Sequence, residues 1–209
     1  MTTPDESVRV PSQERAIRTR ASLVGAAKAE FSERGYASAT AKSIAERAGV
    51  STGSFYQYFR DKDQVLYELA DERQTHVATQ VLAVLGAERA LPASRAELTE
   101  NLRGEIRGLV GIVIEYHRED PGLHAVLTER RHADPGLDER TSRAETLLVM
   151  RIGLLLRALG MNGDVDATAF VLFGMVEGSV HAHVLGRPVV DDARLTDALV
   201  DAMVRVALS

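Results

Sequence analysis

The feature that most constrains the fold is the stretch from residue 40 to residue 62, TAKSIAERAGVSTGSFYQYFRDK. The hydroxyl of Thr40 can cap a helix whose apolar residues follow at helical spacing. Gly49 stands where the chain has to turn sharply, since glycine tolerates a positive φ. Ser51 can then start a second helix, in which two phenylalanines four residues apart can face inward. The pattern predicts a helix-turn-helix, whose second helix enters the DNA major groove.

Length and composition limit the classes of protein. The chain has 209 residues, of which 45% are hydrophobic and 26% charged, which suits one large or two small domains. It has no cysteine, so disulfides, thiolate nucleophiles and cysteine-ligated metals are excluded. We find no run of about 20 uncharged apolar residues and no signal-peptide core, so we expect no membrane partner and a cytoplasmic protein.

Charge is distributed unevenly along the chain, whose net charge is −5. Residues 1–62 hold ten Lys/Arg and seven Asp/Glu, a net charge of +3, and residues 63–209 hold fifteen and twenty-three, a net charge of −8. All three lysines, Lys28, Lys42 and Lys62, lie in the first part. This asymmetry fits a DNA-reading head on an acidic body.

Long segments rich in Ala, Leu, Glu and Arg predict an all-α fold of about nine helices. Besides the two helices of the helix-turn-helix, we expect helices over residues 15–34, 61–86, 94–119, 120–132, 134–159, 164–185 and 192–207. In the first of these, the predicted inward stripe is Ile17, Ala21, Val24, Ala27 and Phe31. In the helix over 134–159, it is Leu147, Met150, Leu154 and Ala158.

We expect three parts: a disordered arm at residues 1–13, a helix-turn-helix domain at 14–61, and a body for ligand binding and dimerisation at 62–209. The helix over 164–185 is apolar nearly all round, which is typical of a helix buried on more than one side. It can face its own domain and a second subunit, so the last two helices of two chains would form a four-helix interface. The predicted interface residues are Phe170, Gly174, Gly178, His181, Val184, Leu195, Leu199 and Met203.

With this layout, the chain resembles the TetR family of bacterial transcriptional regulators. The matching residues are Ala26, Ala27, Phe31, Gly35, Tyr36, Thr40, Ile44, Ala45, Ala48, Gly49, Val50, Ser51, Gly53, Phe55, Tyr56, Tyr58, Phe59 and Lys62. The resemblance covers roughly residues 15–67. It implies a homodimer that represses from a palindromic operator and is released by a small molecule bound in the body, with no catalysis and no cofactor.

Other functions stay open at this point. An activator, or a regulator without a small-molecule ligand, has the same sequence pattern. An all-α enzyme or an adaptor lies outside the class. Against the enzyme, we find no Glu-x-x-His pair on two facing helices, no glycine-rich phosphate loop and no serine elbow. The intact stretch from Thr40 to Lys62 speaks against an adaptor that has lost DNA binding.

Each predicted DNA contact has a chemical reason. Thr40, Lys42 and Lys62 can bind DNA phosphates. At the start of the second helix, short hydroxyl side chains can donate hydrogen bonds, and a glycine lets the backbone approach the DNA closely. Gln57 can read adenine, or can be an ordinary exposed residue. The second helix holds no Lys or Arg, so the commonest guanine contact is absent there. The full predicted set is Thr40, Lys42, Ser51, Thr52, Gly53, Ser54, Tyr56, Gln57, Tyr58 and Lys62.

The body offers weaker signals, because polar residues inside apolar stripes are only candidates for a pocket. The predicted pocket residues are Val113, His117, Leu127, Met150, Phe173 and Glu177. Glu177 lies four residues before His181, so a mutual hydrogen bond is the simplest interpretation and ligand contact the alternative. His181 and His183 point to different sides of a helix, and His124 and His132 have no clear metal partner. We therefore expect no metal site, and we interpret Arg130 and Arg131 as a solvated face.

Overall fold

The computed structural model describes residues 12–85 and 94–208. The predicted arm therefore lies almost wholly outside the described residues, as does the predicted helix end at Gly86. Within the described ranges the chain forms nine helices and no strand, which confirms the all-α prediction. The helices are α1 (Ser12–Ser38), α2 (Ala41–Arg47), α3 (Thr52–Tyr58), α4 (Lys62–Leu85), α5 (Arg95–Glu119), α6 (Pro121–Arg131), α7 (Pro135–Ala158), α8 (Val165–Leu185) and α9 (Asp192–Ala207).

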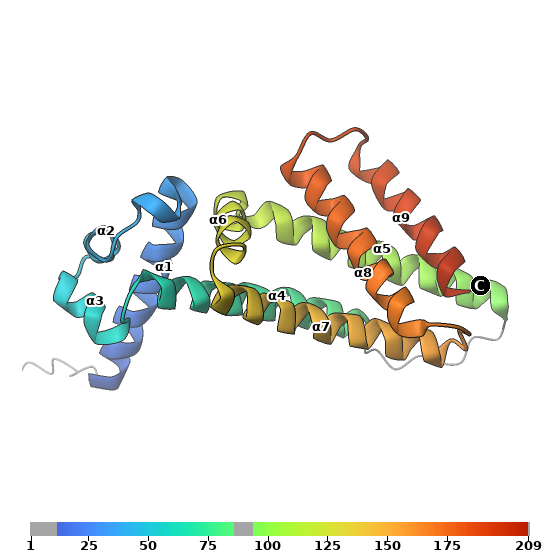
Figure 1. The fold of residues 1–209 in the computed structure, drawn as a ribbon, viewed down its shortest axis with the longest axis horizontal. Coiled ribbons are helices and arrows are strands. Elements are labelled where there is room, and N and C mark those ends of the chain that lie inside the picture. Colours follow the sequence, from blue (N-terminus) through green and yellow to red (C-terminus); the bar gives the residue numbers. More distant parts are fainter. Residues whose placement is uncertain (1–11, 86–93, 209) are drawn as a thin grey trace, which may run out of the picture. The chain divides into compact units, whose positions relative to one another are not determined.

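The chain divides into two compact units that meet within α4, between Leu69 and Ala70. In the first unit, α2 packs against both α1 and α3 (Figure 1). Its core is apolar and fully buried, and its largest members are Leu23, Phe31, Ile44, Phe55, Phe59 and Leu66.

The predicted inward stripe of α1 is only partly correct. Val24, Ala27 and Phe31 are buried, but Ile17 is 61% exposed and Ala21 is also exposed. α1 is kinked at Gly35 (φ 74°, ψ 167°), and its part before the kink is still much longer than α2 or α3, which have seven residues each. These short helices therefore cover only part of it.

Helix starts follow the predicted caps closely. The side chains of Ser94, Asp120, Asp134 and Asp164 each accept a hydrogen bond from a backbone N–H in the first turn of the helix that follows. Such caps satisfy donors that the helix itself leaves unpaired. The starts of α5, α6, α7 and α8 are thereby confirmed.

In the second unit, α5 is the central helix. It packs against both α8 and α9, and α7 packs against α8 (Figure 1). The core joins one face of α5 to α8 and α9, through buried residues that include Leu102, Ile106, Val110, Ile114, Ala169, Leu172, Val180, Leu199, Val200, Met203 and Val204.

The inward face of α7 was predicted wrongly. Leu147, Met150 and Leu154 are 54–61% exposed, and Ala158 is exposed as well. The face that packs inward carries Leu148, Ile152, Leu155, Leu156 and Leu159, which line a cavity or belong to the core. The sequence LLVMRIGLLLRAL places apolar residues on both sides of the helix. Periodicity therefore could not show which side faces the core.

The predicted interface residues separate into three groups. On α8, Phe170, Gly174 and Gly178 are exposed, whereas His181 lines a cavity. Val184 and Leu195 are half-buried. Leu199 and Met203 are buried in the core of their own chain, so their predicted place in an interface is wrong. The reason is that α9 turns its apolar face to α5.

By length and composition alone, α8 is apolar enough to cross a membrane, contrary to our expectation from the sequence. The core helix of a water-soluble domain passes the same test. α8 carries Asp166 and Glu177 and packs against α5 and α7, while 22% of its apolar window is buried.

Candidate DNA-binding face and ligand cavity

The turn between α2 and α3 is held by local hydrogen bonds. Thr40 and Ser43 form a reciprocal capping box at the start of α2, with both N···O distances at 3.0 Å. Gly49 has a φ of +70°, as predicted for the turn. At the start of α3, the Ser51 hydroxyl accepts a 3.1 Å bond from the Ser54 backbone N–H. These bonds fix the direction of α3 against the core.

The outer side of α3 carries side chains with no place in that core. Tyr56 is 58% exposed, with its ring perpendicular to that of Phe55, and Gln57 and Gly53 are also exposed. A Cβ atom at Gly53 would meet only the Ser51 hydroxyl, at 3.7 Å. The open side of Gly53 is therefore available to a macromolecule.

The predicted residues of this face differ in exposure. Thr40, Lys42 and Ser51 are exposed, whereas Thr52, Ser54 and Tyr58 are half-buried. Ser51 and Thr40 also serve as helix caps, so a DNA role would come in addition to a structural one.

Basic side chains near α3 are paired with carboxylates. Arg47 bonds Glu30 and Glu33, and these neighbours raise its pKa above the usual range. The ammonium of Lys42 lies 3.8 Å from Glu46, with both side chains mostly exposed. An exposed pair such as Lys42 with Glu46 is worth about 0–1 kcal/mol, so a phosphate can replace the Glu46 carboxylate at little cost.

Lys62 has a different position from the one expected of a phosphate ligand. Its ammonium donates to the carbonyl oxygens of Tyr36 (2.7 Å) and Ala39 (2.9 Å) and lies 4.0 Å from the centre of the Tyr36 ring. These carbonyls belong to the end of α1 and the residue that follows it. Lys62 thus joins the start of α4 to the end of α1, and its contact with phosphate stays a prediction.

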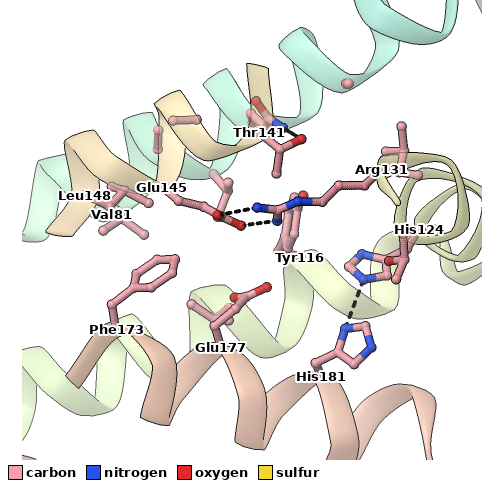
Figure 2. Close-up of a pocket in the computed structure, with 18 of the residues that line it drawn as sticks. Val81, Tyr116, His124, Arg131, Thr141, Glu145, Leu148, Phe173, Glu177 and His181 are labelled. Carbon is pink, nitrogen blue, oxygen red and sulfur yellow. Dashed lines mark hydrogen bonds and ion pairs between the residues drawn. The ribbon is translucent and has the colours of Figure 1, made fainter. Parts of the chain in front are cut away.

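The second unit contains a cavity of about 370 Å³ (Figure 2). Four predicted pocket residues line it: Val113, Leu127, Phe173 and Glu177. Met150 does not, because it lies on the exposed face of α7. His117 is fully buried beside Glu177 and does not line this cavity or the smaller one described below.

The sequence did not reveal the polar wall of this cavity. Arg131 bonds Glu145 at 2.6 and 2.8 Å and Asp138 at 2.9 Å, and so faces the cavity instead of forming a solvated face (Figure 2). Thr141 accepts a 2.9 Å bond from Gln74 on α4. Each partner lies on another helix, so no local spacing could indicate these pairs.

A second cavity of about 100 Å³ adjoins the first. The two share Val81, Val113, Leu148, Phe173 and Glu177. Apart from Glu105 and Glu177, the residues that line the second cavity are apolar. Together the cavities offer an apolar interior with a polar wall at one end.

Three histidines, His117, His124 and His181, meet at the edge of the larger cavity, where the sequence analysis expected no metal site and gave His124 no metal partner. His124 Nε2 lies 3.3 Å from His181 Nδ1, and His117 Nε2 lies 3.4 Å from Glu177 Oε1 (Figure 2 draws His124, His181 and Glu177). Glu177 therefore faces His117, not His181 as the spacing of four suggested.

Charge states in this cluster follow from burial and from neighbouring charges. Burial, with His117, Arg73 and His181 nearby, lowers the pKa of His124 to about 4, so it is neutral at pH 7. Burial of Glu177 opposes ionisation. The adjacent His117 and the other two histidines outweigh it, so the pKa of Glu177 is below its usual value. The cluster thus combines a neutral imidazole with a carboxylate.

Parts of this chain are similar in sequence to transcriptional regulators from bacteria. The HTH-type transcriptional regulator HbdR of Aromatoleum sp. (strain CIB) is 33% identical over 112 residues, which cover 44% of this chain and 49% of HbdR. The HTH-type transcriptional regulator TtgR of Pseudomonas putida is 39% identical over 66 residues, 31% of each chain. The chain thus matches half or less of the length of these curated relatives.

Solved structures share the whole fold. A putative TetR-family transcriptional regulator from Mesorhizobium loti has a TM-score of 0.73 at 20% identity, with 93% of this chain and 96% of that chain covered. The regulator FadR from Bacillus subtilis, in complex with stearoyl-CoA, has a TM-score of 0.69 at 18% identity, with 89% and 98% covered. At such identities the likeness concerns the fold alone.

Two family descriptions match the chain in sequence. Residues 23–69 match "Bacterial regulatory proteins, tetR family", and residues 101–206 match "Tetracyclin repressor-like, C-terminal domain". The first covers the helix-turn-helix described above, and the second covers most of α5 and the helices α6 to α9, which enclose the cavities together with α4. The chain therefore belongs to the TetR family of bacterial transcriptional regulators, which bind DNA.

Proposed function

We propose that this protein is a homodimeric repressor in the cytoplasm that binds a palindromic operator and is released by a small-molecule effector. The observation that carries the proposal is the pairing of an exposed α3 face with a separate unit that encloses a cavity. The first feature suits DNA reading, and the second suits a ligand.

The DNA contacts assigned to this face are short hydroxyls, Tyr56, Gln57 and the open side of Gly53. The described part of α3 has no basic side chain. Sequence reading would then rest on Gln57 with adenine, on thymine methyl groups and on DNA shape. Lys42 and the surrounding arginines would supply phosphate contacts, which fix position and give a steep salt dependence.

The effector proposed is a molecule with an elongated apolar body and a polar end. The smaller cavity is lined almost wholly by aliphatic side chains, and the larger one offers Arg131, Tyr116 and Thr141. FadR from Bacillus subtilis, which has the same fold, was solved with stearoyl-CoA, a molecule of that general character. A bound chain would wedge between α4, α5, α7 and α8, which line the cavities.

Dimerisation is assigned to the exposed apolar face of α7 and α8. Leu147, Met150 and Leu154 on α7 and Phe170 and Val171 on α8 are all more than half exposed. Several large apolar side chains gathered on two adjacent helices mark an interaction site more often than a free surface. The exposed Gly174 would let a helix of the partner approach closely. This face replaces the predicted pairing through α9.

A gel-shift titration with the DNA upstream of the protein's own gene, at two stated salt concentrations, tests the proposal. We expect a specific complex that competitor DNA of unrelated sequence does not displace, and a footprint with two-fold symmetry. Long-chain acyl compounds should then release the DNA. Binding that is equally strong on unrelated DNA would contradict the operator, and a complex insensitive to every such compound would contradict the effector class.

A further inference from the structure

We propose that His117, His124, His181 and Glu177 form a binding site for one divalent transition-metal ion of the zinc class. The four residues come from three helices: His117 from α5, His124 from α6, and Glu177 and His181 from α8. The inference does not depend on DNA binding, because the site lies wholly within the second unit.

The donor set fits this class of ion. Imidazole nitrogens with a carboxylate oxygen are ligands that Zn²⁺, Co²⁺ and Ni²⁺ accept, whereas Ca²⁺ and Mg²⁺ require oxygen ligands. One ligand atom from each of the three histidines lies within 4.8 Å of the other two. The histidines are mostly buried, with His117 and His124 nearly inaccessible to solvent.

Two of the distances between donor atoms fit a tetrahedral site. Two ligands about 2.05 Å from a zinc ion at the tetrahedral angle lie about 3.3 Å apart. His124 Nε2 and His181 Nδ1 are 3.3 Å apart, and His117 Nε2 and Glu177 Oε1 are 3.4 Å apart. The ligand atoms of the three histidines lie within 4.8 Å of one another, so the remaining histidine pairs have to approach by roughly 1.5 Å at most. The carboxylate of Glu177, which contacts only His117 among them, also has to move toward His124 and His181.

His117 shows most clearly that a cation would fit here. Its Nδ1 lies 2.8 Å from the Val113 carbonyl oxygen, which can only accept, so Nδ1 carries the proton. With Nδ1 protonated, Nε2 of a neutral ring would be a bare lone pair facing a carboxylate oxygen, and this buried atom has no hydrogen-bond partner among the described residues. Either a proton on Nε2 or a metal ion between the two acceptors resolves this clash.

The surroundings suit a bound metal ion. A backbone carbonyl that fixes the Nδ1–H tautomer is the usual outer partner of a metal-binding histidine. The ring of Tyr116 packs edge-on against both His117 and His124, which holds the two imidazoles in place. His124, His181 and Glu177 also line the larger cavity, so a bound ion can be reached from it.

Cobalt titration of the full-length protein, stripped with chelator and without an affinity tag, tests the proposal. We expect one Co²⁺ per chain, the strong visible absorption of tetrahedral cobalt, and its loss when Zn²⁺ is added. His181→Gln and Glu177→Gln, checked by circular dichroism for an unchanged fold, should weaken binding. For His181→Gln the loss should exceed the about 10–100-fold that outer-shell substitutions cost.

The matched control is His76→Gln, since His76 is an exposed histidine on α4 that contacts Gln80. It should bind cobalt as the parent does. The proposal is overturned if the parent binds no stoichiometric Co²⁺, if the spectrum is that of octahedral cobalt, or if His181→Gln binds as tightly as His76→Gln. In that case a proton shared between His117 and Glu177 explains the geometry.

Discussion

The ammonium of Lys62 donates a 2.9 Å hydrogen bond to the carbonyl oxygen of Ala39. A second bond, to Tyr36, makes this lysine the link between the end of α1 and the start of α4. The sequence analysis gave Lys62 to a DNA phosphate, because a lysine at a helix start is poorly placed for the helix dipole. The two carbonyls supply another reason for its position.

We therefore expect Lys62→Met to lower the free energy of unfolding and to leave the salt dependence of DNA binding unchanged. Hydrogen bonds to a charged group contribute about 1.5–3 kcal/mol, less where water can reach the carbonyls, so we expect a loss of about 1–2 kcal/mol. Urea unfolding measures it. Lys42→Met, at an exposed pair, is the control and should cost less than about 0.5 kcal/mol.

The same variant separates the two roles of Lys62. Loss of one phosphate contact lowers the slope of log K against log[salt] by about one. We expect the slope for Lys62→Met to match that of the parent. A slope lower by about one, with stability unchanged, would restore the phosphate contact predicted from the sequence.

Gly53 offers a direct test of the DNA-binding face. Because an added Cβ would meet only the Ser51 hydroxyl, at an ordinary contact distance, Gly53→Ala should fold as well as the parent or slightly better. If DNA lies against this helix, the methyl group should weaken operator binding about tenfold, or about 1.4 kcal/mol.

Fluorescence anisotropy at fixed salt measures that loss. The control is Gly104→Ala on α5, where a Cβ meets nothing within 4 Å. This variant should leave operator affinity unchanged. Equal affinities for Gly53→Ala and Gly104→Ala would show that DNA does not approach the start of α3.

The sequence predicted the head and the helix starts well because their signals are local. Asp120 and Asp134 cap helices through bonds to residues two or three positions away. Gly49 takes its positive φ within a turn of a few residues. Such features depend on short-range geometry, which residue type and spacing encode directly.

The site in the second unit was harder to predict from the sequence, because it depends on how helices that are distant in the chain pack against one another. His117 and His181 are 64 positions apart, and only the packing of α5 against α8 brings them together. The correct face of α7 could not be chosen either. Leu148 and Met150 are both apolar, and only the packing of α7 against α8 decides that Leu148 points inward.

Asp192 predicts a pH dependence of the body's stability. The Arg118 guanidinium, at 2.6 and 2.8 Å, and His183 Nε2, at 2.8 Å, hold the pKa of this carboxyl well below its usual range. Because the folded pKa is lowered, the stabilisation is fully present well above the unfolded value of about 3.9, begins to fall near that value, and is lost only as pH falls through the lowered folded pKa.

Asp192→Asn should therefore be less stable than the parent at pH 7, and the difference should shrink at pH 3.5. Urea unfolding at both pH values measures the two differences. Arg118→Gln, which removes the first partner, should show the same trend. A difference that is equal at the two pH values would mean that the carboxylate charge contributes nothing, and that packing alone accounts for the loss.

The exposed side chain of Phe170 gives a test of the dimer face. It is 67% exposed in the single chain, so Phe170→Glu places the new carboxylate in water and should not disturb the fold of the monomer. In a dimer through α7 and α8, the same carboxylate would be buried against apolar side chains at a cost of several kcal/mol. Light scattering after size exclusion should show a dimer for the parent and a monomer for the variant.

Val189→Glu, at a position 94% exposed between α8 and α9, introduces the same charge outside this face and should stay dimeric. A dimeric Phe170→Glu protein would move the interface away from α7 and α8, and a monomeric parent would remove the reason for a palindromic operator.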